Sequence, residues 1–379
     1  LRRRIMLTRI WSLVIKEFIH LRKDWWLPAF MLLGGAMELL LVGWATSRPI
    51  TNLPMMVLDQ DQSAASRALI TALINTETFA FEEQVDSLDT IETALDLGRI
   101  NAAVIIPPDY SEQVDSTTGH PTVSVLINGA ESVPGVAALR AIEGVVRDLN
   151  EKIVLDRLGL EQGSFSGFNF SLRVWFNEAM VDALYTTPAE LGLMLEFTIL
   201  LFAALSFSRE KELGTLEQLL VKPFSSLEII IGKSIPVILI GFTDFVIMLG
   251  LIVFAFEVPL RGSLALLLGL ALLYTFVELG KGLVVSVISS SQHQAFLIVM
   301  VFGMTDFMFT GYAAPVESMP QALQFVANFI PAHHFMGILR GILLTGAGLD
   351  VLWPHVLALV LLGLVIGGFS LRFVRRALD

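Results

Sequence analysis

The sequence predicts an α-helical polytopic membrane protein with six transmembrane helices, an N-terminal interfacial helix and a small external α/β domain between the first two spans. The 379 residues are 54% hydrophobic and only 16% charged, with a mean hydropathy of +0.71, whereas soluble domains carry about 25% charged residues. Apolar stretches long enough to cross about 30 Å of hydrocarbon recur along the chain. This composition excludes a disordered chain, a coiled coil and an ordinary cytosolic enzyme. The absence of cysteine excludes disulfides and thiolate metal sites.

The net charge of −11 comes from one segment of the chain. Residues 47–185 contain 20 acidic and 8 basic side chains, a net of −12, and the remainder has 16 acidic and 17 basic side chains. An acidic insert argues against nucleic-acid binding, which needs a basic face. We therefore expect contact with membrane lipid and none with nucleic acid.

Residues 1–25 are amphipathic. Their apolar residues fall on one helical stripe, and basic residues lie elsewhere, which is typical of a helix lying in the membrane interface. The stripe consists of Leu7, Trp11, Val14, Phe18 and Leu21.

Six apolar stretches are long enough to span the membrane. Arg22 and Lys23 precede the first, and Arg372, Arg375 and Arg376 end the last. Since an excess of Lys and Arg marks the cytoplasmic side, both termini are predicted to be cytoplasmic, which requires an even number of spans. The spans are predicted at 26–46, 188–208, 229–256, 263–288, 293–312 and 352–373.

Residues 47–187 are predicted to form the external domain, periplasmic or extracellular. Apolar runs with strand character alternate with helical patterns, and this alternation favours a small α/β fold. The strands are predicted at 55–61, 79–85, 101–107 and 122–128, and the helices at 62–75, 88–97 and 134–158.

The remaining residues, 188–379, hold spans two to six, one internal loop and one external segment. The loop at 209–222 is short, charged and helix-prone, as expected of a device that receives force from a cytosolic partner. Residues 313–350 carry few charges and are broken by prolines; because irregular backbone at membrane depth must be covered by protein, we expect external re-entrant helices there. Candidate coupling residues are Arg209, Glu210, Glu212, Gly214, Thr215, Glu217, Gln218, Lys222 and Pro223. Candidate re-entrant residues are Pro315, Glu317, Pro320, Pro331 and Arg340.

Ionisable side chains within the predicted spans form a second candidate site. A charge at the bilayer centre costs about 2.5–3.5 kcal/mol on insertion scales, so such residues usually face the bundle interior or a wet cavity. They are predicted either to line a substrate path or to neutralise each other structurally, as Glu278 and Lys281 can at i, i+3. Glu196 and Lys281 also fall near span ends, from which long side chains can snorkel. The candidate path residues are Glu38, Asp244, Glu278, Lys281 and Asp306.

No motif indicates an enzyme. Gly232-Lys233-Ser234 resembles the end of a phosphate-binding loop, but Leu227 stands where that loop needs another glycine. His333 and His334 are adjacent, so on a helix they diverge by about 100° and make a poor metal site. We expect no catalytic, cofactor-binding or metal-ligating residue in this chain, and any ATP hydrolysis belongs to a partner chain.

The internal loop, read together with five other segments, resembles the permease subunit of type-2 ABC transporters, in the multidrug-export branch. The resemblance runs from residue 16 to 376. The segments are Lys16-Glu17-Phe18 with Arg22-Lys23-Asp24, Leu53-Pro54 with Val57-Leu58-Asp59-Gln60-Asp61-Gln62-Ser63, Val258-Pro259-Leu260-Arg261-Gly262-Ser263, Pro315-Val316-Glu317-Ser318-Met319-Pro320, and Ile338-Leu339-Arg340-Gly341-Ile342.

The resemblance implies a dimer of permease subunits, or a pair with a paralogue, in a bacterial plasma (inner) membrane. Two cytosolic ABC ATPase subunits would bind ATP and Mg²⁺, and residues 209–222 would pass their motion to the spans. The implied role is export of drugs or other amphipathic small molecules, with a periplasmic adaptor as a partner of the external domain.

Three alternatives stay open. The same scaffold could export a glycan or a lipid-linked substrate, although a large external domain favours the drug branch. The chain could be a non-transporting envelope scaffold or mechanotransmission protein. An ion-driven transporter could use Asp244, Glu278 and Asp306 as coupling sites, but it would usually show inverted repeats or paired broken helices, which are not visible.

Overall fold

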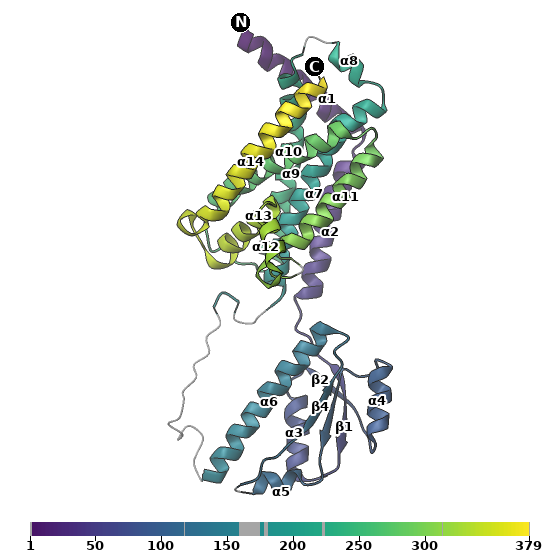
Figure 1. Cartoon of the computed structure of the whole chain (residues 1–379), viewed down its shortest axis with the longest axis vertical. Helices are drawn as coiled ribbons and strands as arrows, with labels where there is room; N and C mark the ends of the chain where they lie inside the picture. Colours follow the sequence, from purple (N-terminus) through teal and green to yellow (C-terminus); the bar gives the residue numbers. More distant parts are fainter. Residues whose placement is uncertain are drawn as a thin grey trace. The chain divides into compact units, whose positions relative to one another are not determined.

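The structure is a computed structural model that describes residues 2–116, 118–158, 175–177, 181–221, 224–312 and 314–378. The chain forms two compact units. The helical unit comprises Leu1–Arg48 and Val174–Asp379, and the α/β unit comprises Pro49–Arg173. Figure 1 labels the helices and strands of both units. Residues 159–174 and 178–180, within the predicted external domain, lie outside the described residues.

The α/β unit contains a four-stranded sheet in the order β2-β1-β3-β4, with helices packed against it (Figure 1). Strand β1 pairs in parallel with β2 and β3, and β3 pairs antiparallel with β4. The strands are β1 (Leu53–Asp59), β2 (Phe79–Gln84), β3 (Ala102–Ile106) and β4 (Ser124–Ile127), and the helices are α3 (Ala64–Ile74), α4 (Leu88–Asp96), α5 (Tyr110–Asp115) and α6 (Ser132–Leu158).

Strand β1 is one of the two inner strands of the sheet and is apolar on both faces. Met55 and Val57 are fully buried on the face that α3 covers, and Leu58 joins a second cluster on the opposite face. This double burial is typical of parallel strands. At the end of β1, the Asp59 carboxylate accepts hydrogen bonds from the Gln62 amide (2.9 Å) and the Ser66 hydroxyl (2.7 Å). These bonds fix the turn that starts α3.

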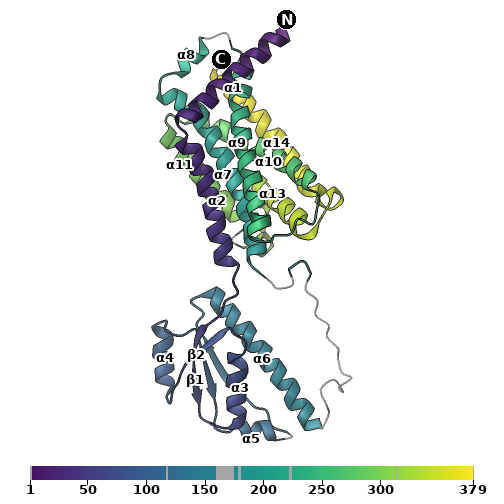
Figure 2. The same ribbon diagram turned by 180° about the vertical axis from the view of Figure 1, so that it is seen from behind.

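In the helical unit, five helices are long and apolar enough to cross a membrane. Helix α7 lies at the centre: α2, α9, α10, α11 and α13 all contact it, and Figures 1 and 2 show the other long helices grouped around it. Outward apolar side chains on α2, such as Leu33 and Met37, suit a lipid environment. The five helices are α2 (Trp26–Thr46), α7 (Ala183–Glu212), α9 (Ser226–Ala255), α10 (Leu264–Ile288) and α14 (Leu349–Leu378).

The stretch predicted as a sixth span, 293–312, is occupied by α11 (Gln292–Phe309), and α11 is not among the five helices. Its first turn carries Gln292, His293 and Gln294, and Asp306 lies near its other end, so its mean hydropathy is lower than that of the five. Its 18 residues extend about 27 Å at 1.5 Å per residue. Five of the described helices are therefore candidate membrane spans by length and composition, which is consistent with a polytopic membrane protein.

Close helix contacts depend on two glycines. A Cβ added at Gly282 of α10 would lie 2.5 Å from Ala203 Cβ and 2.8 Å from the Leu200 carbonyl oxygen of α7. A Cβ added at Gly303 of α11 would lie 2.2 Å from the Phe197 ring of α7. Because real Cβ atoms do not approach so closely, the missing side chains let α10 and α11 come this near to α7.

Short helices follow α11, and prolines start two of them. Pro320 precedes α12 (Gln321–Ala327), and Pro331 is the first residue of α13 (Pro331–Arg340). A proline at a helix start loses no hydrogen bond, because that amide has no partner inside the helix. Before them stands the 3-10 turn Val316–Ser318, preceded by Pro315; after them the chain forms the π-helical turn Gly341–Thr345.

Helix α1 (Arg2–Lys23) lies against α9, and α8 (Leu216–Leu220) is a short helix between α7 and α9. The predicted apolar stripe of α1 divides in two: Val14 is buried with Leu13 and Ile10, whereas Leu7, Trp11 and Phe18 are exposed. The difference arises because α9 covers one side of α1. A Cβ at Gly232 of α9 would lie 2.6 Å from Leu13 Cβ, so Gly232 permits this contact.

Candidate functional site

The first candidate site is a buried ion-pair network, here called the Lys233 network, that joins α1, α7 and α9. The Lys233 ammonium lies 3.0 Å from Glu17 Oε1 and 3.3 Å from Glu210 Oε1, and it donates to the Ser206 carbonyl at 2.8 Å. Lys16 lies 2.5 Å from the same Glu210 oxygen. The Lys233 side chain is only 1% exposed. Lys233 belongs to the motif that resembles a phosphate-binding loop, but its ammonium pairs with two carboxylates of this chain.

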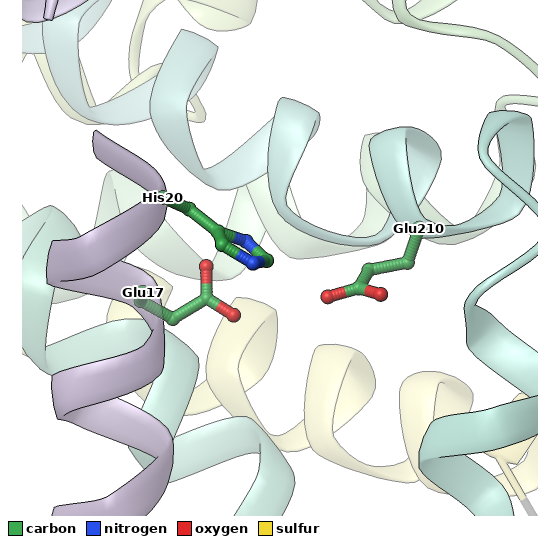
Figure 3. Close-up of side chains that lie close together, drawn as sticks. All are labelled: Glu17, His20 and Glu210. Carbon is green, nitrogen blue, oxygen red and sulfur yellow. The ribbon is translucent and has the colours of Figure 1, made fainter. Parts of the chain in front are cut away.

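Figure 3 shows Glu17, His20 and Glu210 directed toward one another. One ligand atom from each lies within 4.8 Å of the others, a spacing that a metal ion could bridge. Both carboxylates, however, already bind the Lys233 ammonium, and a divalent cation would be repelled by it. Burial lowers the pKa of His20. The arrangement fits structural pairing better than metal binding.

The end of α7 holds the surrounding helices through three charged residues, Arg209, Lys211 and Glu212. Arg209 pairs with Asp24 at the α1–α2 junction. Lys211 donates to the Val287 carbonyl at the end of α10. Glu212 accepts from the backbone amide of Gln292 (2.7 Å), the first residue of α11. Movement of this end of α7 would therefore be passed to α1, α10 and α11 together.

The chain after α7 turns sharply and presents an exposed face. Gly214 has φ of +67°, a conformation that glycine adopts without strain. The Thr215 hydroxyl then donates to Glu210 Oε2 at 2.5 Å, which fixes the turn onto the Lys233 network. Glu217 and Gln218 are exposed on α8, and they form with Leu213 and Val221 a surface that a partner could contact. The remaining candidates, Lys222 and Pro223, lie outside the described residues.

A cavity of about 460 Å³ lies beside the Lys233 network. Its lining comes mainly from α1, α7 and α9, with Leu27 of α2, Gln218 of α8 and Gln292 of α11. The polar lining includes Lys16, Glu17 and Arg209, and Leu27 and Phe202 contribute apolar walls. The cavity therefore combines charged and apolar surface at the meeting point of these helices.

The second candidate site is a group of four charged side chains, here called the Lys281 cluster, in which three buried carboxylates surround the partly exposed Lys281. The Lys281 ammonium lies 2.6 Å from Asp306 Oδ2, 2.8 Å from Glu278 Oε2 and 3.1 Å from Glu196 Oε1. These residues come from α7, α10 and α11. Glu196 and Lys281 do not snorkel to an interface, as the sequence had suggested, because α11 brings Asp306 close to Lys281 in the interior. The predicted pairing of Glu278 with Lys281 is present.

The other two candidate path residues lie apart from this cluster. Asp244 of α9 is buried and accepts a hydrogen bond from the Thr198 hydroxyl at 2.8 Å. Glu38 is exposed on α2, and its electrostatic neighbours are Glu190 and Tyr312. The five predicted residues therefore do not form one continuous path in the described part of the chain: only Glu278, Lys281 and Asp306 meet.

Among the candidate re-entrant residues, Arg340 makes the most contacts. Its guanidinium carbon lies 3.8 Å from the centre of the Tyr185 ring, and it donates to the Gly311 carbonyl at 3.1 Å. Tyr185 donates to the same carbonyl at 2.5 Å. Arg340 thus ties α13 to the start of α7. Glu317 lies in the 3-10 turn, and its backbone carbonyl accepts from the Gln324 side chain at 3.0 Å.

Sequence reasoning missed several members of both sites. Lys16 and Glu17 belong to the predicted interfacial helix, and Lys233 to the motif that resembles a phosphate loop. Glu196 lies near a predicted span end and is not among the candidate path residues. Outside both sites, His355 Nδ1 lies 3.2 Å from His334 Nδ1, a contact that the sequence does not predict. A signal existed for Lys233 and Glu196, since a charge inside an apolar stretch needs a partner, but the partner's identity depends on how the helices pack.

Comparison with known proteins covers nearly the whole chain. The family described as "ABC-2 family transporter protein" matches residues 25–372. The probable multidrug ABC transporter permease YbhR of Escherichia coli is 27% identical over 98% of this chain and 99% of its own length. The inner membrane transport permease YhhJ of the same organism is 25% identical over 94% of both chains.

A more distant relative matches only part of this chain. The ABC transporter G family member 20 of Dictyostelium discoideum is 28% identical over 43% of this chain, which is 22% of that protein. The family is one of membrane transport subunits and implies partnership with an ABC ATPase, in accord with the apolar helices of the structure. The chain is therefore a multi-pass membrane protein and belongs to the ABC-2 transporter family.

Proposed function

We propose that this chain is the transmembrane subunit of an ATP-driven exporter that moves drugs or other amphipathic small molecules out across a bacterial inner membrane. A separate cytosolic ATPase subunit binds the ATP and Mg²⁺ and supplies the energy. The observation that carries this proposal is the end of α7, where Arg209, Lys211 and Glu212 hold α1, α10 and α11 beside an exposed turn. A motor that pushed on this turn would move three helices at once.

The proposed function also implies an arrangement of the chain in the membrane. The turn at 209–222 faces the cytoplasm, as do both termini, and the α/β unit lies outside. Helix α11 then serves as the sixth span, with Gln292 at the cytoplasmic end. A second copy or a paralogue completes the transporter, and the external unit offers a surface for a periplasmic adaptor.

The proposed cargo class rests on two supports. One is the similarity to YbhR of Escherichia coli, a probable multidrug ABC transporter permease. The other is the cavity beside the Lys233 network, whose charged and apolar lining suits molecules that carry both characters. An amphipathic compound could enter such a cavity from the cytoplasm or from the inner leaflet.

We predict that Glu212→Ala combined with Glu217→Ala uncouples ATP hydrolysis from transport. The first change releases the amide of Gln292 from α7, and the second removes an exposed charge from α8. Coupling free energies between sites typically correspond to factors of about 5 to 150, and we expect transport per ATP to fall within that range while ATP hydrolysis continues. The measurement is transport and ATPase activity in vesicles that contain the copurified complex.

A matched control is Glu92→Ala, which removes one exposed carboxylate from α4 in the other unit. It should leave the ratio of transport to hydrolysis at the wild-type value. If the Glu212/Glu217 variant also keeps the wild-type ratio at equal assembly with the ATPase, the turn does not transmit the motion.

A further inference from the structure

The Lys281 cluster is unbalanced in charge. Three carboxylates surround a single ammonium, and all three, Glu196, Glu278 and Asp306, are buried. One ammonium neutralises one carboxylate. In an apolar interior, the remaining two negative charges would lose most of their solvation and have no counter-ion.

The elements packed around the cluster supply no second cation in the part of the chain that the structure describes. Tyr274 of α10 donates to Glu196 at 3.2 Å, but it is neutral. Asp244 of α9 is directed to Thr198 and adds only another carboxylate. Glu278 Oε1 is buried and has no hydrogen-bond partner among the described residues, although Oε2 of the same group faces Lys281. A carboxyl oxygen in this position is suited to carry a proton.

We propose that the Lys281 cluster is a proton-binding site that holds two protons when its carboxylates surround Lys281 as they do here. The protons are shared by the three carboxyl groups and belong to the cluster as a whole. Protons fit this site better than a larger cation because the groups are in direct contact. The Lys281 side chain is 14% exposed, and protons exchange between the cluster and water at this residue.

Helix α11 connects this site to the end of α7. Glu212 holds the first residue of α11, and Asp306 lies 14 positions further along the same helix, about 21 Å away at 1.5 Å per residue. Between them Gly303 contacts the Phe197 ring of α7. A shift of α11 would therefore draw Asp306 away from Lys281 and change the number of bound protons, which pass to or from water. This link rests on the proposed function.

Infrared spectroscopy of the full chain in lipid nanodiscs tests the proton count. The carbonyl stretch of a protonated carboxyl group is separate from the bands of carboxylates, so difference spectra isolate the cluster. With Glu278→Gln, two carboxylates and one ammonium need a single proton, and the cluster's acid band should fall by about half. With Lys281→Met, three carboxylates need three protons, and the band should rise by about half.

The double variant Glu278→Gln/Lys281→Met should return the band to the wild-type area, because two carboxylates then need two protons. Glu92→Gln is the control for an exposed carboxylate, and it should change nothing. Equal bands in the wild type and in both single variants would overturn the proposal. The two single variants are expected to change the band in opposite directions, so either of them, together with the double variant, still tests the proton count if the other folds poorly.

A second measurement tests the link through α11. In the complex with the ATPase, ATP binding should change the acid band, and Glu212→Ala should abolish that change. An unaltered ATP response in Glu212→Ala would overturn the link but not the site. Failure of the chain to assemble with any ATPase would refute the proposed function and leave the proton count, measured without a partner, as found.

Discussion

Replacing Lys233 with methionine will destabilise the helical unit more than any other single change considered for this chain. The variant keeps the length of the side chain but removes the buried ammonium that contacts both Glu17 and Glu210, which leaves the partly exposed Lys16 as the one cation that these two carboxylates still share. Removing one partner from a buried ion pair typically costs about 3–5 kcal/mol, because a charge stays buried and uncompensated. We expect a loss of this size in the free energy of unfolding, measured by denaturant titration in mixed micelles.

Two further variants separate this effect from a general loss of charge. Arg9→Met breaks the 3.8 Å contact with Glu228, in which Arg9 is 38% exposed, and exposed pairs contribute about 1 kcal/mol or less. Adding Glu210→Gln to Lys233→Met should recover part of the lost stability, since one buried charge disappears. A double variant as unstable as the single one would contradict the assignment of Lys233 as the counter-ion.

The second large effect is expected at Gly282, where α10 crosses α7. Gly282→Ala adds a methyl group 2.8 Å from the Leu200 carbonyl oxygen, which is backbone and cannot rotate away. Overpacking of this kind costs about 1–3 kcal/mol. The forced separation would also move Glu278 and Lys281 of α10 away from Glu196 of α7. We expect lower unfolding free energy and weaker ATP-coupled transport.

Gly269→Ala is the matched control because it makes the same substitution in the same helix. Nothing lies within 4 Å of the Cβ that it adds. Alanine favours the helix over glycine by about 1 kcal/mol, so this variant should be as stable as the wild type or slightly more stable. Equal losses from both substitutions would contradict the assignment of the Gly282→Ala loss to the contact with α7.

The positions of the long helices were readable from the sequence because lipid requires an unbroken apolar surface. Helix α2 occupies the predicted stretch 26–46, and α9 and α10 lie within a few residues of theirs. The alternation of apolar runs with helical patterns likewise indicated four strands, which the structure places near 53–59, 79–84, 102–106 and 124–127. The pattern of side chains within each segment is enough to predict these helices and strands.

The sequence does not predict which residues pair with one another in the two charged sites. Glu17 meets Lys233 across 216 positions, and Glu196 meets Lys281 across 85. Which carboxylate meets which lysine depends on helix rotation and on close approaches at Gly232, Gly282 and Gly303. The periodicity of a single helix contains no information about these contacts. A charged residue inside an apolar stretch predicts that the residue has a partner, but it does not indicate which helix supplies that partner.

The long separation in sequence between Glu17 and Lys233 also determines when their contact can form during biosynthesis. When α1 leaves the ribosome, the lysine that will hold it has not been made, and at 5–20 residues per second the wait for 216 residues is about 10–40 s. During that time Glu17 lacks the buried lysine with which it pairs in the folded chain. A chain that ends before Lys233 never receives this partner, so the contact between α1 and α9 belongs to the last stage of assembly of the helical unit.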